Sequence, residues 1–222
     1  MIIGNGIIAN AVKSYDRNDT IFFASGVSNS LETRTSEFER ELSLLKAVHD
    51  ENKEKKLVYF STLSIHDQSK QDSAYVLHKK SVENYIKNNA DSFIILRVGN
   101  VVGKGGNPNT LFNFLKKQIA DKKAFSLHLK ARRLLLDIED ISKFLDSHCL
   151  TLSNKTVNFA FPYYYDLKEI IKAIEMVTGD KACYLEVDEG DFYTVDFDEG
   201  INTFFSEISP EEYLESIIRK YI

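Results

Sequence analysis

Cysteine is scarce in this sequence. Only Cys149 and Cys183 occur among its 222 residues, and their separation does not match the short spacing of cysteine ligands in metal sites. Two such thiols are typical of a protein from a reducing compartment, and we expect both to be buried and unreactive. The five histidines also lack the spacing of metal ligands. No metal site is therefore predicted.

Long apolar runs and basic clusters are missing as well. No apolar stretch approaches the roughly 18 residues that a membrane-spanning helix needs, and the N-terminus lacks the basic start of a secretory signal. The 28 basic and 33 acidic residues are interspersed and leave a formal net charge of −5, so no basic stripe indicates nucleic-acid binding. We expect a cytoplasmic protein that binds neither membrane nor nucleic acid.

The order of elements in the first half predicts the fold class. Hydrophobic residues make up 43% of the chain, which is enough for a sizeable core. The expected elements are the strand Met1–Ile3, the helix Ile7–Tyr15, the strand Thr20–Ala24, the helix Ser36–Asn52, the strand Lys56–Ser61, the helix Ser73–Asn89 and the strand Ser92–Val98. Apolar strands that alternate with helices predict an α/β protein, with a parallel sheet covered by helices on both faces.

The helix over residues 36–52 has two features of its own. Ser36 and Glu39 have the spacing of a capping box, which predicts that the helix begins there. One face of the helix is expected to be apolar and to pack against the sheet. The residues of that face are Phe38, Leu42, Leu45 and Val48.

The second half follows a different rhythm after Gly103. The expected elements are the helix Thr110–Asp121, the strand Arg133–Ile138, the helix Asp140–Leu150, the strand Thr156–Ala160, and the helices Asp166–Thr178 and Pro210–Tyr221. We therefore divide the chain into a Rossmann-like core of residues 1–104 and a second part of residues 105–222. The second part is expected to be interleaved with the sheet and to supply a smaller lobe.

A glycine turn follows the first strand and opens a helix, which is the context of a dinucleotide-binding turn. Gly4 would permit the tight turn, Gly6 would let a pyrophosphate approach the backbone, and Ala9 would let the helix pack closely on the strand. Together with Ile7 and Ile8, these residues form the predicted cofactor-binding turn, at a helix N-terminus that favours an anion. An ordinary glycine turn is the alternative.

One part of the usual dinucleotide site is missing. A charged residue normally follows the turn by about 20 residues, at the end of a second strand, and holds the adenosine ribose. Here the next strand ends in Ser25 and Gly26, and it resembles a later strand of dinucleotide-binding proteins whose small-residue end lies under the cofactor. The short run from Ala9 to Thr20 leaves no room for the usual second and third strands. We therefore expect a sheet reduced in strand number, with an open adenosine side.

Two pairs of residues have a Tyr-x-x-x-Lys spacing, Tyr75 with Lys79 and Tyr164 with Lys168. On a helix this spacing places both side chains on one face, about a turn apart. A nearby ammonium stabilises a phenolate, which suits the tyrosine to proton exchange nearer neutral pH. Tyr75 follows a strand that ends in hydroxyls at Thr62, whereas Tyr164 does not. Tyr75 is the preferred candidate, with a partly exposed structural tyrosine as the alternative.

Five segments in this order resemble the extended short-chain dehydrogenase/reductase family, in the branch that acts on nucleotide-activated sugars. They are the glycine turn, the strand ending in Thr62, Tyr75-x-x-x-Lys79-x-x-x-Glu83, Leu96-Arg97-x-x-Asn100-x-x-Gly103, and the segment from Arg132 to Ile141. The resemblance implies NAD or NADP as the cofactor. It also implies that Thr62 holds the reacting sugar oxygen, that Tyr75 is the acid/base, and that Lys79 lowers the tyrosine pKa and holds the nicotinamide ribose.

The resemblance also implies that residues 105–222 supply the small C-terminal substrate lobe. It implies that Asn100 contacts the substrate near its diphosphate and that Arg133 pairs with a substrate phosphate. A turn residue is the alternative for Asn100, a surface salt bridge for Arg133, and a structural ion pair is the preferred interpretation of Arg97. Asp140 is expected to cap its helix.

Departures from the family pattern narrow the implied activity. Leu63 and Ser64 stand where the family's 4,6-dehydratases carry an Asp-Glu pair, so a dehydratase is disfavoured. A shortened adenosine pocket suits a cofactor that leaves after one hydride transfer, which favours an NAD(P)-dependent ketoreductase. The chain also resembles the reductase lobe of bacterial capsular-sugar enzymes, which implies a role in surface-polysaccharide sugar biosynthesis. A nucleotide-sugar epimerase and a non-catalytic sugar-nucleotide binder stay open. Analogy also suggests a homodimer formed through the helices at 36–52 and 73–89.

Overall fold

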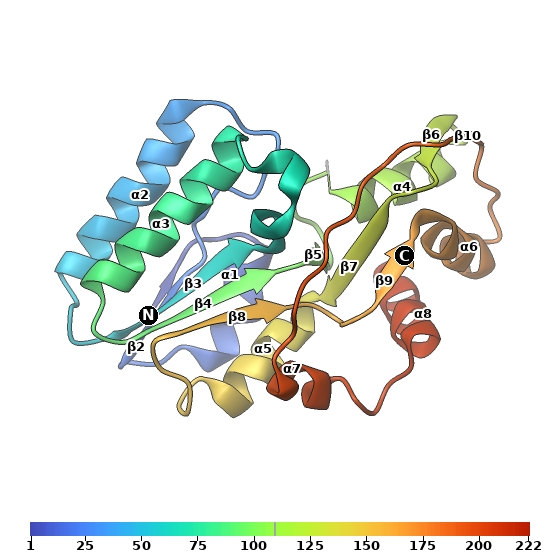
Figure 1. The fold of residues 1–222 in the computed structure, drawn as a ribbon. Helices are drawn as coiled ribbons and strands as arrows, with labels where there is room; N and C mark the ends of the chain where they lie inside the picture. Colours follow the sequence, from blue (N-terminus) through green and yellow to red (C-terminus); the bar gives the residue numbers. More distant parts are fainter. Residues whose placement is uncertain (109) are drawn as a thin grey trace.

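A parallel sheet of five strands forms the centre of the molecule (Figure 1). The computed structural model describes residues 1–108 and 110–222. The strands lie in the order β1-β2-β3-β4-β8, and each neighbouring pair is parallel. Their bounds are Ile2–Ile3 for β1, Thr20–Phe23 for β2, Lys56–Thr62 for β3, Phe93–Val98 for β4 and Lys155–Phe159 for β8. The predicted parallel sheet is confirmed.

Helices cover both faces of this sheet because its strands are apolar on both sides. Side chains of a strand alternate between the two faces. Ile21 and Phe23 pack in the core under α2 (Thr35–Asp50) and α3 (Ala74–Asn89), whereas Phe22 belongs to the core on the other side. That second core includes residues of α5 (Ile138–His148). Figure 1 shows α2 and α3 on one face of the sheet and α1 (Ile7–Ala11) and α5 on the other.

The sheet is reduced on the side of its first strand. β1 lies at the edge and pairs only with β2 among the described residues, through Ile2 and Ile3. The two further strands of a full dinucleotide-binding sheet would lie beyond β1. The predicted loss of these strands is therefore confirmed.

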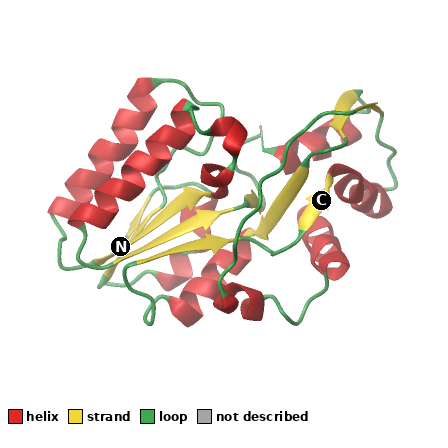
Figure 2. Cartoon of the chain, viewed as in Figure 1, coloured by secondary structure: helices red, strands yellow, loops and turns green. Residues whose placement is uncertain are grey.

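Two smaller sheets are built from the second part of the chain, except for β5, which comes from the end of the first part (Figure 2). One has the order β5-β7-β9, and the other pairs β6 with β10. The bounds of the strands are Asn100–Val102 for β5, Phe125–His128 for β6, Arg132–Asp137 for β7, Tyr164–Asp166 for β9 and Tyr184–Val187 for β10. The helices are α4 (Leu111–Ala120), α6 (Leu167–Thr178), α7 (Glu199–Phe204) and α8 (Pro210–Tyr221). The division between residues 104 and 105 stays a prediction, and β8 returns from the second part to pair with β4.

Several predicted helix ends differ from the structure. The first helix is short: α1 covers Ile7–Ala11, and a separate 3-10 turn covers Lys13–Tyr15. The capping box of α2 is wrong, because the helix begins at Thr35 without a side-chain cap and Ser36 lies inside its first turn. The cap of α5 is Asp137, whose side chain accepts from the N–H of Glu139.

Three further expectations concern single residues. Asp140 does not cap α5 but lies in its first turn, where it accepts a hydrogen bond from the hydroxyl of Tyr213 at 2.7 Å. Cys149 is buried as expected, whereas Cys183 is exposed, because it lies in the connection between α6 and β10. Of the helices within the described ranges, none has both the length and the apolar character needed to cross a lipid bilayer.

Candidate functional site

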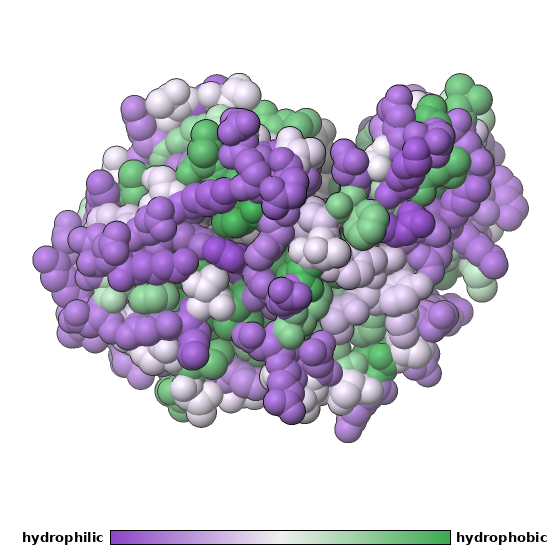
Figure 3. Space-filling model, in the orientation of Figure 1, coloured by the Kyte–Doolittle hydropathy of each residue, from purple (hydrophilic) through white to green (hydrophobic). Residues whose placement is uncertain are grey.

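The predicted site residues of the first half gather at the carboxyl edge of the central sheet. β2, β3 and β4 are parallel, so their carboxyl ends meet at one edge. Thr62 ends β3, and Ser25 and Gly26 follow the end of β2. Figure 1 shows these strands pointing toward β5 and β7. The surface in Figure 3 is notched between the lobe of α2 and α3 and the lobe of α4, β6 and β10.

The glycine turn has the open backbone that a dinucleotide requires. Gly4 has a φ of +128°, and a Cβ atom there would lie 2.4 Å from the carbonyl oxygen of Ala24, so only glycine fits the turn. A Cβ atom at Gly6 would meet nothing within 4 Å, which leaves its backbone open to a ligand. Ala9 is buried, while Ile7 and Ile8 are half-buried. These residues fit a pyrophosphate group laid against the backbone.

Tyr75 and Lys79 lie on one face of α3, near its N-terminus. Ser73 caps the helix by accepting from the N–H of Val76 at 3.3 Å, so Tyr75 lies in the first turn. The ammonium of Lys79 is 5.8 Å from the centre of the Tyr75 ring. Tyr75 is 7% exposed, and its hydroxyl makes no hydrogen bond to any other residue of the described ranges. The hydroxyl of Thr62 accepts from the N–H of Ser64 at 3.1 Å.

A buried carboxylate that the sequence analysis missed lies beneath these residues. Glu41 of α2 is fully buried and accepts hydrogen bonds from Tyr59, His78 and Lys79. The distances are 2.6 Å from the Tyr59 hydroxyl, 2.9 Å from the His78 Nε2 and 2.9 Å from the Lys79 Nζ. The N–H of Val27 also donates to it, at 2.6 Å. We call Glu41, Tyr59, His78 and Lys79 the Glu41 cluster.

The charge of Glu41 is set by its partners. Burial raises the pKa of this carboxyl, but the ammonium of Lys79 and the hydrogen bonds from His78, Tyr59 and Val27 outweigh burial and lower the pKa to about 2. Burial raises the pKa of Tyr59 well above its usual value, and Glu41 raises it further. The cluster therefore holds an ionised carboxylate and a neutral phenol.

A spacing in the sequence could have revealed Glu41. It stands three residues after Phe38 and four before Leu45, which puts it on the apolar face predicted for α2. A charged residue on such a face requires a buried partner. Its partner Lys79 was already singled out.

Arg133 carries a guanidinium without a carboxylate partner. Its Nη1 donates to the carbonyl oxygens of Arg132 at 2.8 Å and Asp191 at 3.4 Å. No ion pair joins it to an acid elsewhere in the described ranges, so the expected alternative of a surface salt bridge is not found. Burial lowers the pKa of Arg133, while Tyr193 and Asp67 act in the opposite direction. A half-buried cation of this kind fits a phosphate group.

Residues 188–198 run over the edge that bears Arg133. This segment links β10 to α7 and passes in front of β7 in Figure 1. The N–H of Val195 donates to the hydroxyl of Tyr164 at 2.7 Å, and the side-chain amide of Asn158 donates to the carbonyl of Asp196 at 2.9 Å. These bonds hold the segment close to the carboxyl ends of the strands.

Two other predicted residues have backbone or ionic partners. Asn100 is half-buried and donates from its amide to the carbonyl of Leu134 at 3.2 Å. Arg97 forms two hydrogen bonds with Glu83, which confirms the structural ion pair. The second Tyr-x-x-x-Lys pair is separated, because Tyr164 lies in strand β9 and Lys168 lies in helix α6.

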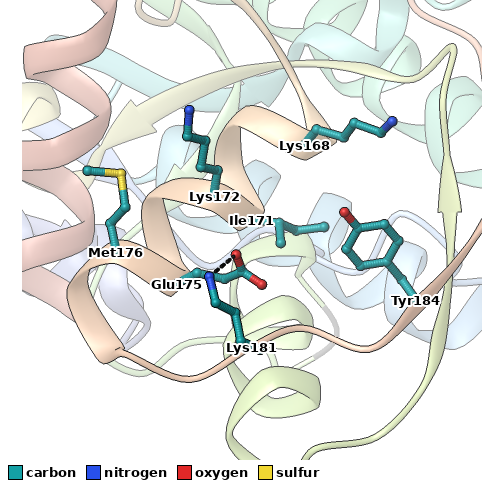
Figure 4. Close-up of a pocket in the computed structure, with 7 residues that line it drawn as sticks. All are labelled: Lys168, Ile171, Lys172, Glu175, Met176, Lys181 and Tyr184. Atoms are coloured by element: carbon teal, nitrogen blue, oxygen red, sulfur yellow. Dashed lines mark hydrogen bonds and ion pairs between the residues drawn. The ribbon is translucent and has the colours of Figure 1, made fainter.

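A hollow on α6 lies apart from these residues (Figure 4). It is lined by Lys168, Ile171, Lys172, Glu175, Met176, Lys181 and Tyr184. Lys168 pairs with Glu186 at 2.7 Å and Lys181 pairs with Glu175 at 3.2 Å, so two of its ammonium groups already have carboxylate partners. The hollow contains none of the predicted site residues and is not the candidate site.

Comparison with known proteins finds similarity in structure. No family model matches the sequence, and no curated protein matches it. The fold is similar to a UDP-N-acetylglucosamine 4-epimerase from Methanobrevibacter ruminantium in complex with UDP-N-acetylmuramic acid, with a TM-score of 0.72 and 17% identity over 99% of this chain and 81% of that one. It is also similar to WbmH from Bordetella bronchiseptica in complex with NAD+, with a TM-score of 0.72 and 17% identity over 98% and 79%.

A third similar structure contains the other nicotinamide cofactor. RMD from Pseudomonas aeruginosa complexed with NADPH has a TM-score of 0.69 and 14% identity over 91% of this chain and 80% of that one. The chain thus spans about four-fifths of these proteins. It has the fold of the nucleotide-sugar epimerases and dehydratases of the short-chain dehydrogenase/reductase type.

Proposed function

We propose that this protein is a cytoplasmic NAD(P)-dependent oxidoreductase that acts on a nucleotide-activated sugar. The observation that carries the proposal is the Tyr75 hydroxyl, which has no hydrogen-bond partner among the described residues and belongs to the helix face that bears Lys79. Thr62 ends the neighbouring strand. A hydroxyl that is free to bond a substrate, with an ammonium nearby, suits an acid/base for a sugar alcohol or ketone.

Nicotinamide chemistry fits the residues around this tyrosine. The open backbone at Gly6 would receive the pyrophosphate, Ser25 and Gly26 would lie under the cofactor, and Lys79 would reach the nicotinamide ribose. A bound nicotinamide supplies or accepts a hydride at the sugar carbon. Tyr75 would move the matching proton at the sugar oxygen, and Thr62 would hold that oxygen.

The substrate class is supported by Arg133. Its guanidinium lies at the edge toward which the central strands point and lacks an acidic partner among the described residues. A nucleoside diphosphate carries the negative charge that such a group binds. Asn100 would contact the substrate on the same side, through the amide group that now bonds Leu134.

Within this class we favour a ketoreductase of surface-polysaccharide sugar synthesis. In the part of the chain that the structure describes, the sheet ends at β1, so the adenosine side of the cofactor lacks the two strands that would hold it. A cofactor that exchanges after each hydride transfer suits a reductase better than an epimerase, which keeps its cofactor through two transfers. An epimerase would instead require the dinucleotide to stay bound throughout turnover.

The test is a titration with NADH and NADPH, followed by nicotinamide absorbance, with and without a panel of nucleotide sugars and their keto forms. A reductase oxidises one cofactor for each keto sugar reduced. An epimerase changes the stereochemistry of the sugar without net oxidation of the cofactor. Binding of nucleotide sugars without binding of either dinucleotide would overturn the proposal in favour of a non-catalytic binder.

A further inference from the structure

The hydrogen bonds of Lys79 leave one donor unused. An ammonium has three N–H donors and no acceptor. One donates to the Oε1 atom of Glu41 at 2.9 Å and another to the Tyr59 hydroxyl at 3.0 Å. No third partner occurs within the described ranges. The ammonium is thus held by two groups on different elements, and its third N–H has no hydrogen-bond acceptor among the described residues.

Both carboxylate oxygens of Glu41 are held by hydrogen bonds. Its two oxygens receive four donors, from Val27, Tyr59, His78 and Lys79. An ionised carboxylate only accepts hydrogen bonds, so the Nε2 atom of His78 carries the hydrogen of their bond. The imidazole of His78 is stacked on Phe38 with a centroid distance of 4.7 Å, which holds the ring in place.

Gly26 lies against the Glu41 cluster, just after β2, where the cofactor is proposed to bind. A Cβ atom at Gly26 would lie 2.8 Å from the Lys79 Nζ and 2.9 Å from the Glu41 Oε1. Any side chain at this position would therefore press on the ion pair. The backbone after β2 lies against Lys79 and Glu41, and the ammonium has room there only because Gly26 has no side chain.

We propose that Glu41 is a positioning residue, which fixes the ammonium of Lys79 so that its remaining N–H faces the nicotinamide ribose. This inference rests on the proposed function and adds Glu41 and Tyr59 to the groups that determine cofactor affinity. Lys79 has a flexible four-carbon stem, and an ammonium that is not anchored loses that freedom only when the cofactor binds. Glu41 removes that cost by ordering Lys79 in advance.

The experiment measures the dissociation constants of NADH and NADPH by fluorescence, with the melting temperature of each variant as a second readout. The central variant is Glu41→Gln, which keeps the volume and removes the charge. Its matched control is Glu83→Gln, since Glu83 is also a buried carboxylate and lies one turn beyond Lys79 on α3. Glu83 bonds Arg97, Ser61 and Lys87, and no hydrogen bond or ion pair joins it to Lys79.

We expect both variants to melt at a lower temperature than wild-type protein. Only Glu41→Gln should bind its dinucleotide more weakly, by at least about tenfold, for whichever of NADH and NADPH the wild-type protein binds more tightly. Affinity for the nucleotide sugar should be unchanged in both. Equal dinucleotide affinity in Glu41→Gln and wild-type protein would overturn the proposal and leave the proposed function standing. Wild-type protein that binds neither dinucleotide would overturn both.

A double-mutant cycle separates action through Lys79 from a direct effect. In a Lys79→Met background, Glu41→Gln should cause no further loss of dinucleotide affinity. A further loss as large as in the wild-type background would show that Glu41 does not act through Lys79. If Glu41→Gln does not fold, Tyr59→Phe removes one anchor of Lys79 and should weaken dinucleotide binding about threefold, with Tyr85→Phe on α3 as the control. Unchanged affinity in Tyr59→Phe would overturn the proposal.

Discussion

The carboxylate of Glu83 accepts two hydrogen bonds from the guanidinium of Arg97, at 2.9 and 2.6 Å. Ser61 donates to the same carboxylate at 2.7 Å. Burial raises the pKa of Glu83, but the bonds from Arg97 and Ser61 prevail and lower it. Glu83 thereby joins α3, which bears Tyr75, to β4 through Arg97 and to β3, which bears Thr62, through Ser61. This ion pair gives a structural role to Glu83, the glutamate that follows Lys79 by one helical turn.

Removal of Arg97 should therefore destabilise the protein. Arg97→Ala leaves the Glu83 carboxylate buried without its main partner, and we expect the free energy of unfolding to fall by about 3–5 kcal/mol. Urea denaturation followed by circular dichroism measures this change. The paired replacement Arg97→Met with Glu83→Leu should recover most of the loss, because no charge is then left buried. A loss below about 1 kcal/mol in Arg97→Ala would contradict this role.

The pKa of Glu41 predicts a loss of stability in acid. The folded-state pKa is about 2, below the ordinary value of 4.5, so the carboxylate stabilises the folded state fully above pH 4.5. This contribution is lost as the pH falls from 4.5 toward 2, and it amounts to about 3 kcal/mol. The free energy of unfolding of wild-type protein should thus fall more steeply over this range than that of Glu41→Gln. If the free energies of unfolding of wild-type protein and Glu41→Gln instead change in parallel over this pH range, the pKa of Glu41 is not lowered in the folded state.

Local patterns in the sequence predicted much of the fold. The apolar strand Thr20–Phe23 and the helix α3 were evident, because a compact apolar run and a helical segment leave a signal in the local sequence. The short strands β5, β6, β9 and β10 were not predicted. Each has three or four residues and depends on a partner distant in the sequence, as Tyr184 depends on Phe125. Such pairings leave little trace in the local sequence.

The candidate site was predicted in part, for a related reason. Gly4, Tyr75 and Lys79 follow motifs whose spacing is visible in one segment. Glu41 was missed because its role arises only when α2 packs beside α3 and Lys79 reaches it. The cap at Asp137 was misplaced to Asp140 because both acids precede the same apolar face, and only the backbone shows which one accepts the N–H of Glu139.

The two glycines of the turn should respond differently to alanine. Gly4→Ala forces a side chain onto a φ of +128° and against the carbonyl of Ala24, so the free energy of unfolding should fall by at least about 1–3 kcal/mol. Gly6 has a φ of −75° and open space at its Cβ position, so Gly6→Ala should keep its stability. Its methyl group would keep a pyrophosphate from the backbone and weaken dinucleotide binding. Calorimetry of unfolding and of binding checks both, and normal dinucleotide affinity in Gly6→Ala would place the pyrophosphate elsewhere.

Arg133→Ala should weaken binding of the nucleotide sugar and leave dinucleotide affinity unchanged. Loss of a charge-assisted bond to phosphate should cost about 1.5–3 kcal/mol, or roughly a tenfold to hundredfold rise in the dissociation constant. Arg132→Ala is the matched control, because adjacent side chains of β7 point to opposite faces and Arg132 donates to the carbonyls of Leu129 and Ala131. Equal affinity in Arg133→Ala and wild-type protein, measured by titration calorimetry, would exclude the phosphate contact.

Tyr75→Phe should abolish turnover while the fold and the affinity for the nucleotide sugar stay nearly intact. The Tyr75 hydroxyl bonds no other described residue, so its removal leaves no partner unsatisfied and should hardly change the free energy of unfolding. A positioned acid/base contributes about 10²–10⁴-fold to the rate, and a loss of that order should appear in kcat, since proton transfer occurs in the transition state.

Tyr85 is a better control for this experiment than Tyr164. Tyr164 has the same spacing to a lysine, but its hydroxyl accepts from the N–H of Val195, so Tyr164→Phe would also loosen the segment over the site. Tyr85 lies on α3 like Tyr75, and its hydroxyl bonds no other described residue, so Tyr85→Phe tests the loss of a phenol from the same helix. Near wild-type turnover is expected for Tyr85→Phe. Near wild-type turnover in Tyr75→Phe, with the keto sugar that the wild-type protein reduces, would rule out Tyr75 as the proton donor.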